Sequence, residues 1–329
     1  MRHRRGKRLN EMKIAAEPAP RPGILEIAPY IGGGARIAGV ERPIRLASNE
    51  SALGPSVKAI AAYRALAGEI HRYPDGSADE LREALGRRHG LDPARIVCGA
   101  GSDELITLLL RSYAGPGDEV LYSRHGFLMY PINAQTVGAT PVAAPERALT
   151  TDVDALLERV TESTRIVFVA NPNNPTRTYL GATEMARLHA GLRLGWAYCP
   201  PAIADVLNRM RSPFNVNAPA LAAGIAAVED VAALVRAQTH NQRWLAWFSE
   251  RLTALGILLT PSVANFVLAR FPDDPRNNAD AVFAHLQRQG ILTRKMGAYG
   301  LPQYLRITIG TGEEMERVVA TLGEILAAR

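Results

Sequence analysis

Apolar positions recur along this chain with two different periods, and the order of the two periods predicts a sheet covered by helices. Residues 56–67 and 77–89 carry apolar side chains at the spacing of amphipathic helices. Short apolar runs then alternate with helical stretches, so strands are expected at Ile96–Cys98, Val120–Tyr122 and Arg165–Ala170, and a helix at Glu104–Tyr113. This alternation is typical of a mostly parallel sheet with helices on its faces.

The pattern changes after Pro219. A long helical stretch rich in tryptophan is followed by strand-like runs at Asn265–Phe271 and Tyr304–Gly310 and by a closing helix at 312–328, which indicates a smaller α+β lobe. We therefore expect a disordered basic tail at 1–23, an N-terminal arm at 24–45, a large domain at 46–218 and a small C-terminal domain at 219–329.

Composition narrows the class of protein. A chain of 329 residues with 47% hydrophobic content can bury a large core. Residues 1–13 contribute +5 of the net charge of +6, so no nucleic-acid-binding face is predicted. Neither a membrane-spanning run nor a secretion signal is found, and a cytoplasmic protein without membrane contact is expected. Cys98 and Cys199 are too few for a disulfide framework or a zinc cluster, and no metal site is predicted.

One motif offers a phosphate site at the end of an expected strand, which is where open α/β sheets bind ligands. In "CGAGSDEL" the glycines permit a tight turn, and Ser102 and Asp103 begin a helix. The free N–H groups and the dipole at a helix N-terminus favour a phosphate. Serine and aspartate are also ordinary capping residues, so this motif alone is consistent with a simple cap.

Two further motifs offer an aromatic ring and an amide. In "RHGFLMYP", Phe127 follows a strand and can stack on a flat ring, although an aromatic residue at such a place more often packs in a core. In "VFVANPNNPTRTYL", prolines fix the backbone while Asn174 presents an amide that can donate to a phenolic oxygen. A generic proline-rich turn leaves the paired asparagines unexplained.

With these motifs, the runs "LASNESALGPS", "RYPDGSADELREAL", "GLRLGWAY", "PFNVNAPA" and "LRITIGTGEEMERV" resemble the histidinol-phosphate aminotransferases, from about residue 24 to the C-terminus. The resemblance implies the α/β fold type I of the pyridoxal-phosphate-dependent transferases, with a mostly parallel sheet in the large domain and a small α+β domain. It also implies pyridoxal 5′-phosphate as cofactor. The implied activity is amino transfer between histidinol phosphate and 2-oxoglutarate in histidine biosynthesis.

Residue by residue, the resemblance assigns the cofactor phosphate to Ser102, Asp103 and Arg193. The planar fork of an arginine suits a phosphate better than the point charge of a lysine. The resemblance also stacks Phe127 on the pyridine ring and lets Asn174 bind the 3′-oxygen of that ring.

For the substrates, a phosphorylated amine and a 2-oxo acid, the resemblance assigns Tyr30, Arg294 and Arg306. It also lets Tyr73 reach the phosphate of the neighbouring subunit, which implies a homodimer. Independently, apolar side chains alternate around Arg306 in "YLRITIG", so Arg306 is expected to point away from the core. A solvated surface arginine is the alternative, and it is more credible for Arg294.

The chain lacks the lysine that the family uses to form a Schiff base with the cofactor and to move a proton. The family has this lysine eight residues before the arginine matched by Arg193, and Met185 stands there instead. The helix expected before this place and the strand expected after it adjoin directly. We infer an internal deletion near 190–193 of roughly fifty to sixty residues, including two sheet strands and the aspartate that pairs with the pyridine nitrogen.

No catalytic residue is therefore assigned. The chain contains only four lysines, and Lys7 and Lys13 lie in the tail while Lys58 lies on a helix. Lys295 neighbours Arg294, but successive side chains on a strand point to opposite faces, so we do not expect Lys295 to take over.

A second departure is Arg177, where the family motif has a glycine after "NPNNPT". If this position has a positive φ, an arginine strains the loop that carries Asn174.

Three interpretations follow from these observations. The chain has the family activity, or it is a non-catalytic remnant that at most binds phosphorylated ligands, or a longer and active chain contains the missing segment. Within the family, aromatic amino-acid or threonine-phosphate chemistry remains open, because paired arginines favour a phosphate or carboxylate without choosing among them.

Overall fold

The computed structural model describes residues 19–181, 185 and 198–327. The helices are α1 (Val57–Ala65), α2 (Asp79–His89), α3 (Ser102–Tyr113), α4 (Met129–Val137), α5 (Val153–Leu157), α7 (Pro201–Met210), α8 (Ala218–Glu229), α9 (Val231–Ala254), α10 (Ala279–Arg288) and α11 (Gly312–Ala327). The strands are β1 (Ile44–Arg45), β2 (Glu119–Ser123), β3 (Thr140–Ala144), β4 (Glu146–Arg147), β5 (Thr150–Thr151), β6 (Thr164–Phe168), β7 (Leu258–Leu259), β8 (Phe266–Arg270), β9 (Ile291–Leu292), β10 (Arg294–Lys295) and β11 (Tyr304–Thr308).

The large lobe is built on a parallel sheet in the order β3–β2–β6. Its central strand β2 is covered on both faces, because Val120 packs under α3 and α4 while Leu121 packs against Leu156 of α5. Helices on both faces are expected for parallel strands. The carboxyl ends of β2 and β6 lie at one edge of this sheet, and the "RHGFLMYP" and "NPNNPT" loops begin there.

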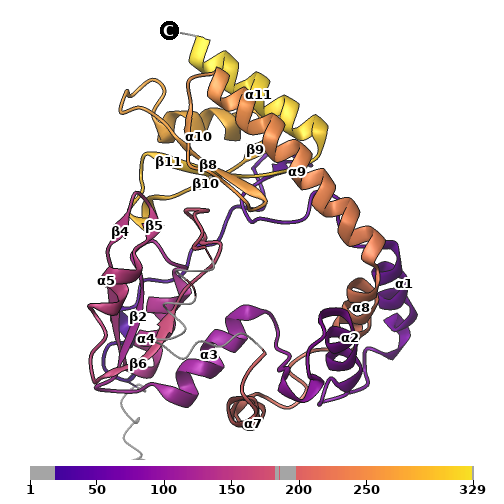
Figure 1. The fold of residues 1–329 in the computed structure, drawn as a ribbon. Helices are drawn as coiled ribbons and strands as arrows, with labels where there is room; N and C mark the ends of the chain where they lie inside the picture. The colour runs from indigo at the N-terminus through magenta and orange to yellow at the C-terminus, as the bar shows by residue number, and fades with distance from the viewer. Residues whose placement is uncertain (1–18, 182–184, 186–197, 328–329) are drawn as a thin grey trace, which may run out of the picture.

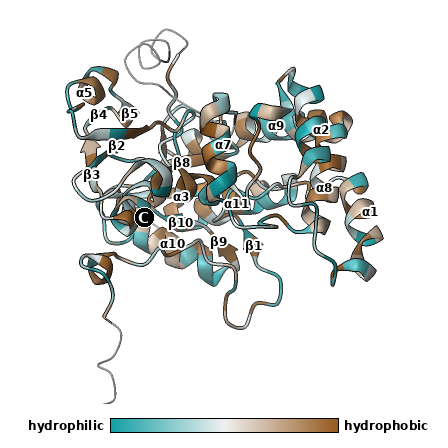
Figure 2. Cartoon of the chain, turned by 90° about the horizontal axis from the view of Figure 1, so that it is seen from below, coloured by the Kyte–Doolittle hydropathy of each residue, from teal (hydrophilic) through white to brown (hydrophobic). Residues whose placement is uncertain are grey.

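The small lobe contains an antiparallel sheet in the order β10–β11–β8–β7, packed against α9, α10 and α11 (Figure 1). Its core includes the fully buried Phe248, Val267 and Leu305. Each large apolar side chain covered in this way stabilises the fold by about 1.5–3 kcal/mol. Strand β1 pairs in parallel with β9, so the N-terminal segment belongs to the small lobe's side of the molecule. The helices carry hydrophobic and hydrophilic residues on one ribbon (Figure 2), as helices with one buried face do.

Helix α9 runs from the small lobe to a group of helices formed by α1, α2 and α8 (Figure 1). The sequence predicts one long helix after Pro219, and the structure has two. Asp230 separates them, because its ψ of 69° is outside the helical range and its side chain accepts from the N–H of Ala233. This contact caps α9 and competes with a continuous helix.

Strand β6 lies at an open edge in the described part of the chain, where β2 is its only hydrogen-bonded neighbour. None of the five residues of β6 is buried, whereas three of the five in β2 are. The strand expected at Ile96–Cys98 is not formed. Ile96 instead makes an isolated antiparallel bridge with Tyr198, because a strand needs a continuous neighbour to form a ladder.

By length and composition, no single helix within residues 19–181 and 198–327 could cross a membrane. Helices α8 and α9 meet that criterion only as a pair, and they are bent by 75° relative to each other.

The unequal cover of the two sheets predicts unequal hydrogen exchange. Amides of β8 and β11, which pair with each other under a complete core, should exchange at least about tenfold more slowly than amides of β6. Exchange measured by mass spectrometry on peptides from each strand tests this, with β2 as the internal reference for the large lobe. Equal protection of β6 and β8 would show that a further strand or segment covers the open edge of β6.

Candidate active site

The N-terminus of α3 is formed as the "CGAGSDEL" motif predicts. Gly101 precedes the helix with φ of 85°, a conformation that suits glycine, and no side chain caps the helix there. Ser102 and Asp103 are exposed in the first turn. The Glu104 carboxylate accepts from the N–H of Ala100 at 2.5 Å and thereby fixes the turn before the helix. This end of α3 can accept an anion, and Arg193, the third predicted phosphate ligand, lies outside the described residues.

Phe127 lies in the turn between β2 and α4 and is half-buried. Its ring meets the ring of Tyr30 with centroids 6.3 Å apart and the ring of Tyr130 at 5.9 Å, and both contacts are edge-on. Neither of these neighbours stacks on Phe127. The geometry is consistent with the predicted role in stacking on a flat ring.

A buried carboxylate braces this turn. Glu146 accepts from the hydroxyl of Ser123 at 2.5 Å, from the backbone N–H of His125 at 3.1 Å, and pairs with Nδ1 of the same histidine at 2.7 Å. The carbonyl of His125 in turn accepts from the side chain of Asn173 at 3.3 Å. Burial raises the pKa of Glu146, but the hydrogen bonds from His125 and Ser123 outweigh it, and the pKa is lowered overall.

Asn174 and Arg306 meet across the two lobes. One Nη of Arg306 donates to Oδ1 of Asn174 at 2.7 Å, and the other donates to the carbonyl of Ala47 at 2.7 Å. Arg306 is buried, and its core-facing neighbours Leu305 and Ile307 confirm the alternation predicted for this strand. Burial, and then the charge of Arg294, lowers the pKa of Arg306 to about 10.

Arg294 lies beside Arg306 in the β10–β11 pair and binds the predicted tyrosine. It donates to the hydroxyl of Tyr30 and to the carbonyl of Ile31, both at 3.0 Å. Arg294 is only 9% exposed, so the alternative of a solvated surface arginine does not apply. The structure therefore brings together the residues to which the resemblance gives the substrate and the cofactor ring: Tyr30, Phe127, Asn174, Arg294 and Arg306.

Tyr73 lies apart from this cluster. It is 83% exposed, and its ring stacks on Phe214 at 4.7 Å. No contact of Tyr73 with the other site residues is found in the described part of the chain.

The two described lysines do not reach the cluster. Lys58 is exposed near the start of α1. Nζ of Lys295 forms an ion pair with Asp280 of α10 at 2.6 Å, while Arg294 points to the other face of the same strand. The expectation that these two neighbours face opposite ways is confirmed.

Arg177 has φ of 67°, so the condition for strain in its loop is met. A left-handed conformation costs an L-residue about 1–2 kcal/mol. The side chain is 1% exposed, and burial lowers its pKa to about 9.

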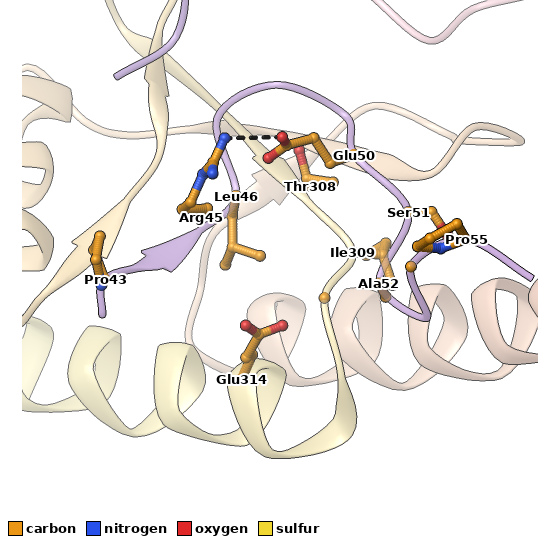
Figure 3. A pocket seen from close by; sticks show the side chains of 12 residues that line it. Pro43, Arg45, Leu46, Glu50, Ser51, Ala52, Pro55, Thr308, Ile309 and Glu314 are labelled. Atoms are coloured by element: carbon orange, nitrogen blue, oxygen red, sulfur yellow. Dashed lines mark hydrogen bonds and ion pairs between the residues drawn. The ribbon is translucent and has the colours of Figure 1, made fainter. Parts of the chain in front are cut away.

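A separate pocket of about 560 Å³ lies beside β1 (Figure 3). Its lining includes Arg45 and Glu50, whose ion pair spans 2.9 Å, and Glu314, which accepts from the N–H of Thr311. None of the predicted site residues lines this pocket.

Two polar residues of this region could not be predicted from the sequence. Glu146 is the first residue of β4, belongs to none of the motifs, and reaches the turn after β2 only because β3 pairs with β2. Tyr299 is buried beside Arg294 and Arg306, and burial raises the pKa of its phenol. Its proximity to two arginines depends on the fold of the small lobe and could not be read from spacing.

Comparisons with known proteins identify the family and agree with the fold. The family model of aminotransferase class I and II matches residues 41–188 and 186–322, so the chain belongs to the class I and II aminotransferases. The chain is 53% identical to the histidinol-phosphate aminotransferase of Paramagnetospirillum magneticum and covers 94% of its own length and 99% of that relative. It is 53% identical, with the same coverage, to the histidinol-phosphate aminotransferase of Rhodospirillum centenum.

Solved structures support the fold class. The structure of histidinol-phosphate aminotransferase from Sinorhizobium meliloti, in complex with pyridoxal-5′-phosphate, matches with a TM-score of 0.83 at 23% identity, over 95% of this chain and 99% of that one. The resemblance derived from the motifs is thus confirmed, and with it the α/β fold of the family.

The brace on Glu146 predicts its titration. In carbon NMR of the side-chain carboxyls, Glu146 should titrate below 4.5, and removing the imidazole and the hydroxyl by His125→Ala and Ser123→Ala should raise its midpoint, because only the backbone N–H of residue 125 then offsets burial. Since the pKa is lowered in the folded state, the brace stabilises above pH 4.5 and this contribution is lost as the pH falls through the lowered pKa. Glu146→Gln identifies the signal. An unchanged midpoint in the double variant would refute the brace.

Proposed function

We propose that this chain is a histidinol-phosphate aminotransferase fold that keeps the binding side of its site and lacks the groups that carry out amino transfer. One observation carries the proposal. Arg294, Arg306 and Tyr30 form an electropositive cluster suited to a phosphate or carboxylate, and neither described lysine reaches it. The function supported best is therefore non-catalytic binding of a phosphorylated amine of the histidinol phosphate class.

The fit between the cofactor and the described residues supports the same proposal. The first turn of α3 and Phe127 suit the phosphate and the ring of pyridoxal 5′-phosphate, and Asn174, held by Arg306, offers an amide to the ring's oxygen. No amine that could attach it, and no free carboxylate for its ring nitrogen, is found in the described part of the site, because Lys295 is paired with Asp280 and Glu146 is held by the brace. The cofactor therefore fits as a non-covalent ligand.

A missing segment accounts for these absences. The alignment with the Paramagnetospirillum magneticum relative spans 360 positions, whereas 94% of this chain is only about 309 residues. The family model matches in two pieces that meet at residues 186–188. The open edge of β6 and the isolated bridge between Ile96 and Tyr198 are what the loss of two intervening strands leaves behind.

We further propose a homodimer in a reducing, cytoplasmic compartment. Exposed apolar side chains on α1 and α9, among them Val57 and Val235, and the exposed Tyr73 support a second subunit. No disulfide joins Cys98 and Cys199, which suits a reducing compartment.

The absent lysine predicts the outcome of covalent trapping. Pyridoxal phosphate mixed with the chain should keep the visible spectrum of the free cofactor, and borohydride reduction followed by peptide mapping should find no adduct on Lys58 or Lys295. The reason is that both amines lie away from the cluster. A stoichiometric adduct on Lys295 would contradict the proposal and would favour amino transfer as the function of the chain.

Repair of the sheet predicts a change in assembly. Inserting the family segment before Ala190, together with Arg177→Gly, should give a dimer whose light-scattering mass is independent of concentration and whose melting temperature is higher. The unrepaired chain should form larger species as its concentration rises, because the open edge of β6 invites pairing with other chains. Arg177→Gly alone is the control. Identical masses and melting curves for both chains would mean that the sheet of the unrepaired chain is stable without the inserted segment.

A further inference from the structure

Arg177 does something that the glycine expected at its position could not do. Its guanidinium leaves the large-lobe loop and enters the small lobe. One Nη donates to the carbonyl of Phe266 at 3.0 Å, and the other donates to the carbonyl and, at 3.1 Å, to the hydroxyl of Thr260. The hydroxyl of Thr260 returns a bond to the carbonyl of Thr176 at 3.2 Å.

The bridge exists in spite of two unfavourable features. The backbone of Arg177 has a positive φ, and its charge is buried at 1% exposure with carbonyl and hydroxyl oxygens, not carboxylates, as its described partners. Its Nε has no described partner. The strained backbone and the buried charge of Arg177 both destabilise its loop. Any stabilisation by this side chain must therefore come from its hydrogen bonds to the small lobe.

A second arginine crosses the same boundary in the opposite direction. Arg306 of the small lobe donates to Asn174, three residues before Arg177, at 2.7 Å. Two guanidinium groups therefore hold the loop at 174–177: that of Arg177, which binds the small lobe, and that of Arg306, which binds the loop. The Arg306 bond fixes the amide oxygen of Asn174.

We propose that Arg177 is a positioning residue that clamps the small lobe onto the large lobe and holds Asn174 in register with Arg306. The clamp belongs to the joint between the lobes and operates whichever ligand the site takes. A guanidinium is suited to it because its planar fork reaches two carbonyls at once.

The distance between the lobes measures the clamp directly. Spin labels are placed on cysteines at the exposed Arg111 of α3 and Arg288 of α10, in a chain with Cys98→Ala and Cys199→Ala. Labelled chain is diluted with unlabelled chain, so that pulsed electron resonance reports distances within one molecule. The chain with Arg177 should give one narrow distance distribution.

Arg177→Gly should broaden that distribution and add a longer component, because the bridge is gone although the backbone strain is relieved. Arg177→Lys, which keeps the charge but not the fork, should broaden it less. Arg147→Gly is the matched control, since Arg147 is exposed and pairs with Asp152 of its own lobe, and it should leave the distribution unchanged.

Two outcomes overturn the proposal. One is a narrow, unchanged distribution in Arg177→Gly, and the other is a distribution that is already broad with Arg177 in place. If Arg177→Gly loses its folded circular dichroism spectrum, Arg177→Lys decides: an unchanged width refutes the clamp, and a broader one supports it.

Discussion

A strand inside a parallel sheet needs a hydrogen-bonded neighbour at each edge and cover on each face, and most of what distinguishes this molecule follows from where that requirement is not met. β2 satisfies it, with β3 and β6 beside it and helices on both sides. In the described part of the chain β6 has only β2 beside it, and none of its five residues is buried. The segment that we propose is missing, with its two strands, its lysine and its aspartate, would lie beyond β6. Its loss would account for both the open edge of β6 and the absent chemistry.

What remains of the site does not depend on those strands. Tyr30 comes from the N-terminal arm, Phe127 from the turn after β2, Asn174 from the loop after β6, and Arg294 and Arg306 from the small lobe. They are joined by hydrogen bonds of 2.7–3.0 Å and by ring contacts across the lobes. No carboxylate partner of the two buried arginines is found among the described residues, and their charges make this region electropositive, which favours an anionic ligand. The residues of this cluster therefore do not require the segment that we propose is missing.

The sequence predicted the elements with strong periodicity and the residues carried by local motifs. The helix at Glu104–Tyr113 and the orientation of Arg306 follow from spacing alone. The strand at Ile96–Cys98 could not be excluded in this way, because its formation depends on a neighbour far away in the chain. The same holds for the brace on Glu146 and the bridge made by Arg177, whose partners Thr260 and Phe266 lie more than eighty residues away. The helix break at Asp230 did carry a local signal, a capping aspartate, which the apolar pattern concealed.

Titration calorimetry with histidinol phosphate tests most directly whether the cluster of Tyr30, Arg294 and Arg306 binds a ligand. We expect saturable binding of one ligand per chain. In Arg306→Gln the affinity should be about tenfold or more lower, since a hydrogen bond to a charged group contributes about 1.5–3 kcal/mol. Arg209→Gln, at an exposed position on α7, is the control and should bind as the unchanged chain does. Absence of saturable heat, or equal affinities with and without Arg306, would show that the cluster is not a binding site.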